Sequence, residues 1–450
     1  MGREDVIKEL LNPPEQAFLV GAEWKMTPDG RYVEHAWSAE ESLAELERLA
    51  ETAGLEVVGQ SVQRLDRPNP ATFVGKGKAE EIAETIRGLG ANVVVFDDEL
   101  SPRHQRELEA LFGNKVKVMD RTGLILDIFA QHANTREGAL QVELAQYEYR
   151  LPRLTQAWTD RAFSQQTGGR AGGSTGGVGL RGPGETRLEM DRRIIRQRIA
   201  QIKRELEEVR AHRARHRSQR RRNGLPTVAL VGYTNAGKST LLHALSGAEV
   251  YVADELFATL DPTTRRVELP GGTAILVTDT VGFIQKLPTQ LIAAFRATLE
   301  EVEDADLLLH VVDASHGQAR EQARAVFDTL QEIGAGELPI LTALNKVDQF
   351  ADPQSAGLAL YDLPDTVAIS ALTGYGIDTL KARLEEALEA EMARVSVLLP
   401  FERGDLVSLF HERGLIQTEE YREQGTVITG RLPHVLLSQF ESYHIKTRKK

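Results

Sequence analysis

The sequence predicts an α/β protein with several parts and a mostly parallel central sheet. Three observations lead to this prediction. Strand-like and helical stretches alternate through residues 17–132. Two series of apolar residues with heptad spacing then flank a glycine-rich segment. Finally, a short apolar run at residue 227 leads into a second series of strands, each followed by a polar loop. Such alternation is typical of parallel sheets covered by helices.

The composition bounds the class of protein. The chain has 450 residues, of which 41% are hydrophobic and 27% charged, so we expect a soluble protein with two to four domains. No apolar run approaches the ~18 residues of a membrane span, and the N-terminus lacks the apolar core of a signal peptide. The absence of cysteine excludes disulfides and thiolate metal sites and fits a cytoplasmic location. A net charge of -12 argues against indiscriminate binding of nucleic acid.

Residues 1–134 are expected to form an N-terminal α/β subdomain. Ser101 followed by Pro102 is typical of a helix N-cap with proline at the first helical position. The predicted strands are 18–24, 55–63, 91–98 and 116–120, and the predicted helices are 38–54, 78–90 and 101–113.

Residues 135–223 are expected to form a long antiparallel helical hairpin. Apolar residues recur with spacings of 4 and 3 from Leu140 to Leu154 and again from Ile195 to Val209. Pro152 should kink or fray the first arm. The alternative is a pair of ordinary amphipathic helices packed on a neighbouring domain.

The tip of the hairpin, residues 168–184, contains nine glycines in 17 residues. It is either a flexible linker or an arginine-bearing tip that becomes ordered against phosphates. The second arm, residues 187–222, carries 14 Lys or Arg against five Asp or Glu, a net charge of +9, so the rest of the chain carries -21. This density favours contact with RNA over a merely solvated face. The predicted RNA-binding residues are Arg170, Arg181, Arg187, Arg213, Arg217 and Arg220.

Residues 224–394 carry the motifs of a P-loop G domain. Residues 232–239 match G-x-x-x-x-G-K-S between a strand and a helix, so that backbone amides and Lys238 face phosphates and Ser239 offers a hydroxyl to Mg²⁺. Asp279 ends the next apolar strand and suits the outer shell of Mg²⁺, while the Gly282 amide can meet the γ-phosphate. Phe283 follows, where many such enzymes have a water-positioning glutamine.

The guanine end of the site is predicted from two further strand ends. In the motif Asn345-Lys346-Val347-Asp348, the Asp348 carboxylate suits the paired N–H donors of guanine, which adenine lacks. Asn345 can tie this loop to the phosphate loop. The backbone amides of Ser370-Ala371-Leu372 can meet guanine O6. Four motifs in this order predict a GTP-binding enzyme.

A threonine between the phosphate loop and Asp279 should close over Mg²⁺, and spacing alone leaves Thr259, Thr263 and Thr264 open. Residues 395–450 are expected to form a small α+β domain, reading strand, helix, two strands and helix. The stretch VGKGK (74–78) is interpreted as a strand-to-helix turn rather than a second P-loop.

With these motifs assembled, nearly the whole chain resembles the HflX family of ribosome-associated GTPases, within the Obg-like branch of translation-factor GTPases. The segments GYTNAGKST, FATLDPTTR, DTVGFI and NKVD match its G domain, and FVGKGK, VVVFDDELSP, DRTGLILDIFAQHA and GGVGLRGPGE match its N-terminal half. The resemblance assigns the threonine that meets Mg²⁺ to Thr259. The full set of predicted GTP-binding residues is Gly232, Tyr233, Thr234, Asn235, Ala236, Gly237, Lys238, Ser239, Thr240, Phe257, Ala258, Thr259, Leu260, Asp261, Asp279, Thr280, Val281, Gly282, Asn345, Lys346, Val347, Asp348, Ser370, Ala371 and Leu372.

The resemblance implies a GTPase that uses Mg²⁺, binds the large (50S) ribosomal subunit with its tip near the peptidyl-transferase region of 23S rRNA, and splits stalled or idle 70S ribosomes, notably after heat stress. Lys238, Gly282 and Asn235 are the predicted catalytic residues. Asn235 is also a candidate K⁺ site, by similarity to GTPases that recruit this ion beside the phosphates. We expect a cytoplasmic monomer when free. Two alternatives stay open: a large-subunit assembly GTPase without splitting activity, and an ATP-dependent RNA-remodelling enzyme acting through the N-terminal half.

Overall fold

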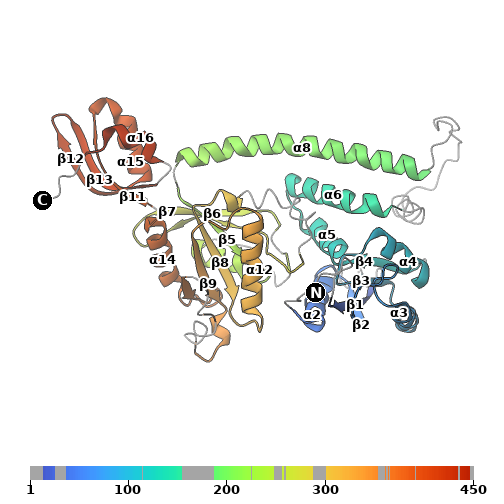
Figure 1. Cartoon of the computed structure of the whole chain (residues 1–450). Coiled ribbons are helices and arrows are strands. Elements are labelled where there is room, and N and C mark those ends of the chain that lie inside the picture. Colours follow the sequence, from blue (N-terminus) through green and yellow to red (C-terminus); the bar gives the residue numbers. More distant parts are fainter. Residues whose placement is uncertain are drawn as a thin grey trace, which may run out of the picture. The chain divides into compact units, whose positions relative to one another are not determined.

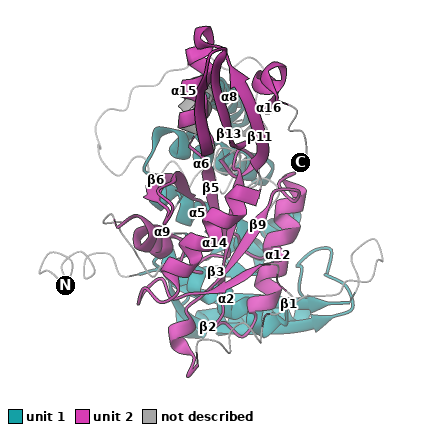
Figure 2. Ribbon diagram, turned by 90° about the vertical axis from the view of Figure 1, so that its left-hand side faces the viewer, with its two compact units in different colours: residues 1–208, 255–260, 286–296 teal, residues 209–254, 261–285, 297–450 magenta. Residues whose placement is uncertain are grey.

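The structure is a computed structural model that describes most of the chain. It divides into two compact units, coloured separately in Figure 2. Unit 1 comprises residues 1–208, 255–260 and 286–296, and unit 2 comprises residues 209–254, 261–285 and 297–450. The description leaves out residues 1–13, 26–36, 114, 155–186, 224, 248–255, 258–259, 287–300, 353–359, 361–362, 364, 391, 434–435 and 446–450.

Unit 1 contains a four-stranded parallel sheet in the order β2-β1-β3-β4. Its interior strand β3 is buried at every residue, and valine-rich strands of this kind are typical of sheets covered on both faces. The strands are β1 (Gln16–Trp24), β2 (Glu56–Leu65), β3 (Val93–Phe96) and β4 (Lys117–Asp120), and the helices are α2 (Ala39–Thr52), α3 (Lys76–Leu89), α4 (Pro102–Phe112) and α5 (Arg121–His132).

The N-termini of the helices in this subdomain begin where the sequence offers caps. Ser38 accepts a hydrogen bond from the Glu41 amide, and Glu41 accepts one in return from the Ser38 amide, which completes a capping box. The predicted cap at Ser101 is confirmed, since its Oγ accepts from the His104 amide and Pro102 occupies the first helical position. Residues 76–78 form the first turn of α3, as the strand-to-helix interpretation of VGKGK requires.

The predicted helical hairpin corresponds to α6 (Arg136–Arg150) and α8 (Arg187–Asn223). Helix α6 and residues 187–208 of α8 belong to unit 1. Leu140 of α6 packs with Ile202 and Leu206 of α8, and Arg198 forms a bidentate pair with Glu143. As expected, the α-helix stops before Pro152 and continues as a 3₁₀ turn, η1 (Leu151–Arg153).

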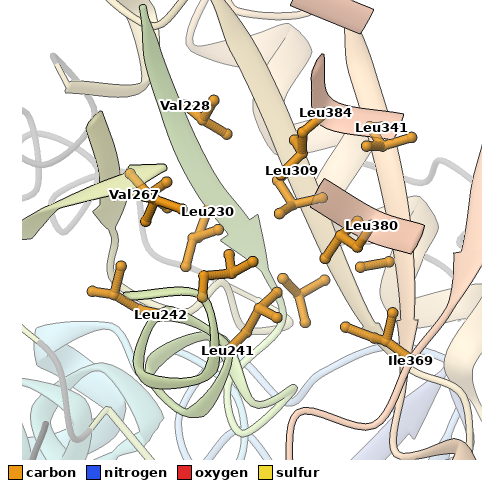
Figure 3. Close-up of a cluster of buried hydrophobic side chains, with 14 of the residues drawn as sticks. Val228, Leu230, Leu241, Leu242, Val267, Leu309, Leu341, Ile369, Leu380 and Leu384 are labelled. Atoms are coloured by element: carbon orange, nitrogen blue, oxygen red, sulfur yellow. The ribbon is translucent and has the colours of Figure 1, made fainter. Parts of the chain in front are cut away.

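Unit 2 contains a six-stranded sheet in the order β10-β9-β8-β5-β7-β6, parallel except for β6 at its edge. Figure 3 shows the apolar side chains of strands and helices that form its core, among them Leu230, Leu309 and Leu384. The strands are β5 (Thr227–Gly232), β6 (Thr263–Glu268), β7 (Ala274–Asp279), β8 (Leu307–Asp313), β9 (Ile340–Asn345) and β10 (Thr366–Ala368), and the helices are α9 (Lys238–Ser246), α12 (Ala319–Glu332), the 3₁₀ turn η2 (Val347–Gln349) and α14 (Ile377–Ala390).

The C-terminal part of unit 2 is a three-stranded antiparallel sheet in the order β11-β13-β12 with short helices (Figure 1). Phe410 and Phe440 meet edge-to-face in its core. The elements are β11 (Met392–Leu399), η3 (Phe401–Arg403), α15 (Gly404–Arg413), β12 (Leu415–Arg422), β13 (Gly425–Pro433), α16 (Leu437–Phe440) and η5 (Glu441–Tyr443).

These elements confirm the predicted fold class, including the mostly parallel sheets and the small C-terminal α+β part. Helix α5 was not predicted, because its sequence RTGLILDIFAQH is apolar on nearly every side and shows no helical period. The predicted division into four domains stays a prediction. Among the helices that the structure describes, none is both long and apolar enough to cross a membrane.

Candidate functional site

The phosphate loop connects the end of β5 to the start of α9, and two of its glycines have little room for a side chain. A Cβ on Gly232 would lie 2.3 Å from the Val311 carbonyl oxygen, and one on Gly237 would lie 2.3 Å from Asn345 Nδ2. Gly237 also has a φ of +93°, which disfavours other residues. At these two glycines the backbone of the loop therefore packs directly against Val311 and Asn345.

Lys238 is buried at the start of α9. Its ammonium donates to the carbonyl oxygens of Gly232 (3.2 Å) and Tyr233 (2.8 Å). Burial lowers the pKa of Lys238 to about 8, and the charge of Asp279 opposes that shift only in part. Lys238 is thus a desolvated cation inside the loop. A bound phosphate would supply the negative charge that favours its protonated form.

Ser239 and Asp279 come together although they are 40 residues apart in the sequence. The Ser239 hydroxyl donates to Asp279 Oδ2 at 2.6 Å, and Asp279 is fully buried at the end of β7. A hydroxyl and a carboxylate are the oxygen donors that Mg²⁺ prefers. These two residues therefore fit the predicted magnesium site.

The segment after β7, called switch II below (residues 279–286), is held against the phosphate loop by its backbone. The Phe283 amide donates to the Gly232 carbonyl (3.0 Å), and the Phe283 carbonyl accepts from the Thr234 amide (2.8 Å). The Phe283 side chain is 5% exposed. An aromatic ring in this buried position orients no water, as the sequence indicated.

Gly282 is packed directly on the phosphate loop. A Cβ placed on Gly282 would lie 2.7 Å from Thr234 Cα and 3.0 Å from Lys238 Nζ. Thr280, two residues earlier, donates its hydroxyl to the Leu230 carbonyl at 2.6 Å. The segment predicted to meet the γ-phosphate thus lies beside the predicted phosphate-binding lysine.

The end of β9 is tied to the phosphate loop as the sequence predicted. Asn345 Nδ2 donates to the Ala236 carbonyl (2.8 Å), and Asn345 Oδ1 accepts from the Ala371 amide (2.9 Å). One side chain thereby joins three loops. Lys346, in a left-handed backbone conformation with a φ of +63°, forms an ion pair with Asp313 at 2.8 Å.

The residues predicted to read the base lie at the same edge of the sheet. Asp348 is exposed in η2, and Ser370 is buried after β10, with its hydroxyl accepting from the Thr373 amide. Ala371 is buried, while the Leu372 side chain is 79% exposed. The carboxylate and the loop amides predicted to read guanine thus converge at the carboxyl ends of neighbouring parallel strands, where such folds bind ligands.

The structure leaves part of the predicted site undescribed. Ala258 and Thr259 lie outside the described residues, so the assignment of the threonine stays a prediction. Of the two alternatives, Thr263 and Thr264 both begin β6, and Thr264 Oγ1 lies 3.0 Å from Thr278 Oγ1. The Thr264 hydroxyl is therefore engaged with Thr278 inside the sheet.

The structure does not describe the side chains of the predicted RNA-binding arginines. Arg170 and Arg181 lie outside the described residues. The backbone positions of the other four belong to α8, but the description does not extend to their side chains. These four are Arg187, Arg213, Arg217 and Arg220.

Sequence reasoning missed one buried group beside the phosphate loop, His310 of β8. Burial, and to a smaller extent the charge of Lys238, lowers the pKa of His310 to about 3. Its ring meets that of Phe327 edge-to-face, with centroids 5.0 Å apart. The signal was a single titratable residue in the middle of the apolar strand LLLHVVD.

Four families match the chain along its length. Their descriptions are GTP-binding GTPase N-terminal (residues 40–130), GTP-binding GTPase Middle Region (132–220), 50S ribosome-binding GTPase (227–346) and HflX C-terminal domain (361–445).

Curated relatives cover most of the chain. GTPase HflX of Lacrimispora saccharolytica is 47% identical over 402 residues, which are 89% of this chain and 91% of the relative. GTPase HflX of Escherichia coli is 46% identical over 388 residues, or 86% and 88%. Among solved structures, a GTP-binding protein of Sulfolobus solfataricus in complex with GDP is 24% identical, with a TM-score of 0.42 and coverage of 83% of this chain and 98% of that one.

Proposed function

Because the chain belongs to the HflX family of GTPases, we propose that it binds the large ribosomal subunit and, in its GTP-bound state, dissociates stalled or idle 70S ribosomes. Hydrolysis of GTP to GDP and phosphate then follows on the large subunit. We further propose that the protein acts in the cytoplasm, as a monomer when free, and that its glycine-rich tip approaches 23S rRNA.

The observation that carries the ribosomal part is the charge of one segment. Residues 187–222 have a net charge of +9 in a chain of net charge -12, so phosphate contacts would be directed to this arm. The description of the family that matches residues 227–346, a 50S ribosome-binding GTPase, supports the same partner.

In the proposed nucleotide site, this chain's residues mainly bind and orient. Lys238 and the phosphate-loop amides hold the β- and γ-phosphates, and the Gly282 amide meets the γ-phosphate. Asp348 and the loop at Ser370 select guanine, and Asn345 keeps that loop in register with the phosphate loop at 2.8 Å. Ser239, Thr259 and Asp279 would hold Mg²⁺, Asp279 through water, and the ion would neutralise charge on the phosphates.

The buried Phe283 leaves the attacking water without an orienting side chain at this position. We propose that hydrolysis is slow in the free protein and that a ribosomal group completes the site, as a group supplied in trans can. Hydrolysis at the same rate with and without large subunits would contradict this.

Asn235 is the proposed ligand of a K⁺ ion beside the phosphates, where a cation would offset developing charge. It lies exposed in the phosphate loop with a φ of +58°. The test compares GTP hydrolysis in KCl and NaCl at matched ionic strength. Equal rates would exclude a role for K⁺.

Sucrose-gradient sedimentation tests the splitting function. Intact 70S ribosomes are incubated with the protein and a non-hydrolysable GTP analogue, and loss of the 70S peak is the expected result. Co-migration with free large subunits while the 70S peak persists would instead favour an assembly role. ATP hydrolysis that survives Lys238→Ala would favour the N-terminal ATP-dependent alternative.

A triple variant separates the arm from the nucleotide site. Arg213→Gln, Arg217→Gln and Arg220→Gln together should abolish splitting without changing the affinity for GTP. The matched control removes three exposed arginines elsewhere, Arg64, Arg103 and Arg422, and should split ribosomes normally. Equal loss in both triple variants would show that overall charge, and not this arm, is responsible.

A further inference from the structure

Two short segments that are close in sequence to parts of the nucleotide site are grouped with the N-terminal compact unit. Residues 255–260 and 286–296 are part of unit 1, whereas the phosphate loop and residues 261–285 are part of unit 2 (Figure 2). Among their described residues, Phe257 follows the phosphate loop in the chain and Lys286 ends switch II. Each of these two residues makes a specific contact within unit 1.

Lys286 forms two short ion pairs with adjacent carboxylates that follow β3. Its ammonium lies 2.5 Å from Asp97 Oδ2 and 2.6 Å from Asp98 Oδ1. The Asp97 side chain is 3% exposed, and that of Lys286 is 29% exposed. Because the carboxylates are nearly buried, this interaction is screened much less than a surface ion pair.

Asp97 is also the centre of a buried polar network. It accepts from Arg121 Nη1 at 2.7 Å and from the Ser42 hydroxyl at 2.6 Å, and Arg121 also pairs with Glu45. Asp97, Asp98 and Glu45 each contact Arg121 or Lys286. Removing the lysine takes a cation away from two nearly buried carboxylates, so the network favours holding it.

The second contact is aromatic. The ring of Phe257 lies edge-to-face on that of Phe129, with centroids 4.6 Å apart. Phe129 and Arg121 both belong to α5. Phe257 therefore contacts α5 directly, and Lys286 pairs with Asp97, which accepts a hydrogen bond from Arg121 of the same helix.

Both anchoring residues have an unusual backbone. Phe257 has a φ of +60° and Lys286 a φ of +54°. Non-glycine residues adopt the left-handed region at a cost of about 1 kcal/mol or more, and they stay there only where the surroundings hold them. The contacts with Phe129 and with the two aspartates are interactions of this kind, made by the same two residues.

The other end of switch II is crowded against the phosphate loop. A Cβ on Gly282 would lie 3.0 Å from Lys238 Nζ, and the Gln285 amide donates to the Tyr233 hydroxyl at 2.8 Å. Switch II is therefore packed on the lysine predicted to bind the γ-phosphate, and Lys286 is only four residues from Gly282 in the chain.

We propose that Lys286 and the Asp97–Asp98 pair form a latch that restrains switch II in the position seen here, so that the latch and the γ-phosphate of GTP oppose each other. Through Arg121, the same latch reports the nucleotide state to helices α2 and α5 of the N-terminal subdomain. This coupling needs no ribosome, and its test is independent of ribosome splitting.

The test measures the affinities of the purified full-length protein for GDP and for a non-hydrolysable GTP analogue, using fluorescent nucleotides. Lys286→Met should raise the affinity for the GTP analogue relative to GDP by about five- to tenfold, the low end of coupling between sites. Asp98→Asn should act in the same direction, and Lys286→Arg, which keeps the charge, should restore the original ratio.

Two controls separate the latch from a general effect. Lys78→Met removes a lysine with an ion pair of 2.7 Å on α3 and should leave the ratio unchanged. The double variant Lys286→Met with Asp98→Asn should shift the ratio no further than Lys286→Met alone, because that substitution already removes the ion pair with Asp98.

Three outcomes would overturn the proposal, once circular dichroism shows that the variants are folded. One is an unchanged ratio in both single variants. Another is equal weakening of both nucleotides, which indicates only a structural role. A third is a ratio shifted toward GDP, which indicates that the ion pairs favour the GTP state. If Lys286→Met does not fold, Asp98→Asn and Lys286→Arg decide the question alone.

Discussion

Burial of Lys238 makes the binding of GTP dependent on pH near neutrality. Its pKa is lowered to about 8, chiefly because burial removes the ammonium from water. Nucleotide phosphates would raise this pKa again, since an adjacent negative charge favours the protonated form. The complex therefore holds more protons than the free protein, and affinity must fall as the pH rises through about 8.

The size of the effect follows from this single pKa. If Lys238 stays protonated in the complex, binding takes up about 0.1 proton at pH 7 and about 0.5 at pH 8. The dissociation constant should then increase by about fourfold between pH 7 and pH 8.5.

Titration calorimetry in two buffers of different ionisation enthalpy measures the proton uptake directly. Measurements between pH 7.5 and 8.5 avoid the second ionisation of the terminal phosphate, which lies near pH 6. Uptake should rise with pH over this range. Absence of uptake at pH 8.5 would show that Lys238 is fully protonated in the free protein and would refute the argument from burial.

Four substitutions test other parts of the site. Gly237→Ala should weaken GDP binding by about tenfold or more in a fluorescence titration, because φ is +93° there and the new Cβ would displace Asn345; unchanged affinity would contradict this. Asp348→Asn should lose GTP and gain affinity for xanthosine triphosphate, since an amide can donate where xanthine has a carbonyl; competition between the two nucleotides measures the exchange. The parent protein should lose about 2 kcal/mol of unfolding free energy between pH 8 and pH 5, because a histidine whose folded pKa is depressed to about 3 costs stability as the pH falls below 6.5. His310→Leu should abolish this loss. Urea unfolding at both pH values checks it, and an equal slope in the parent and the variant would refute it. Phe283→Gln should lower the unfolding free energy by about 3 kcal/mol without accelerating hydrolysis, since the side chain points into the core; a faster rate would show that it can reach the water.

The nucleotide site was largely predictable because its residues stand at strand ends. Parallel strands bring their carboxyl ends to one edge, so that the order of strands in the sequence already groups Lys238, Asp279, Asn345 and Ser370. The contact of Asn345 with the phosphate loop was expected for this reason, and the structure shows it at 2.8 Å.

The acidic network of the N-terminal subdomain was not predictable in the same way. Asp97 and Lys286 are 189 positions apart, and neither belongs to a motif with a known spacing. In a sequence, charged residues indicate a solvated surface, and only the packing of α5 reveals that Arg121 is buried. Helix α5 itself was hidden, because a helix surrounded by protein is apolar on nearly every side.

Switch II therefore connects two kinds of control within eight residues. Asp279 and Gly282 are the residues predicted to meet the metal and the phosphate, and Lys286 pairs with Asp97 and Asp98 of the N-terminal subdomain, so the proposed latch acts on which nucleotide is bound. Phe283, buried between them with its backbone bonded to the phosphate loop, contributes no group to the attacking water. Affinity and hydrolysis thus depend on different partners. Loss of the latch should change the ratio of bound nucleotides and leave the chemical step as slow as before, because the group that the chemistry lacks is not supplied by either end of the segment.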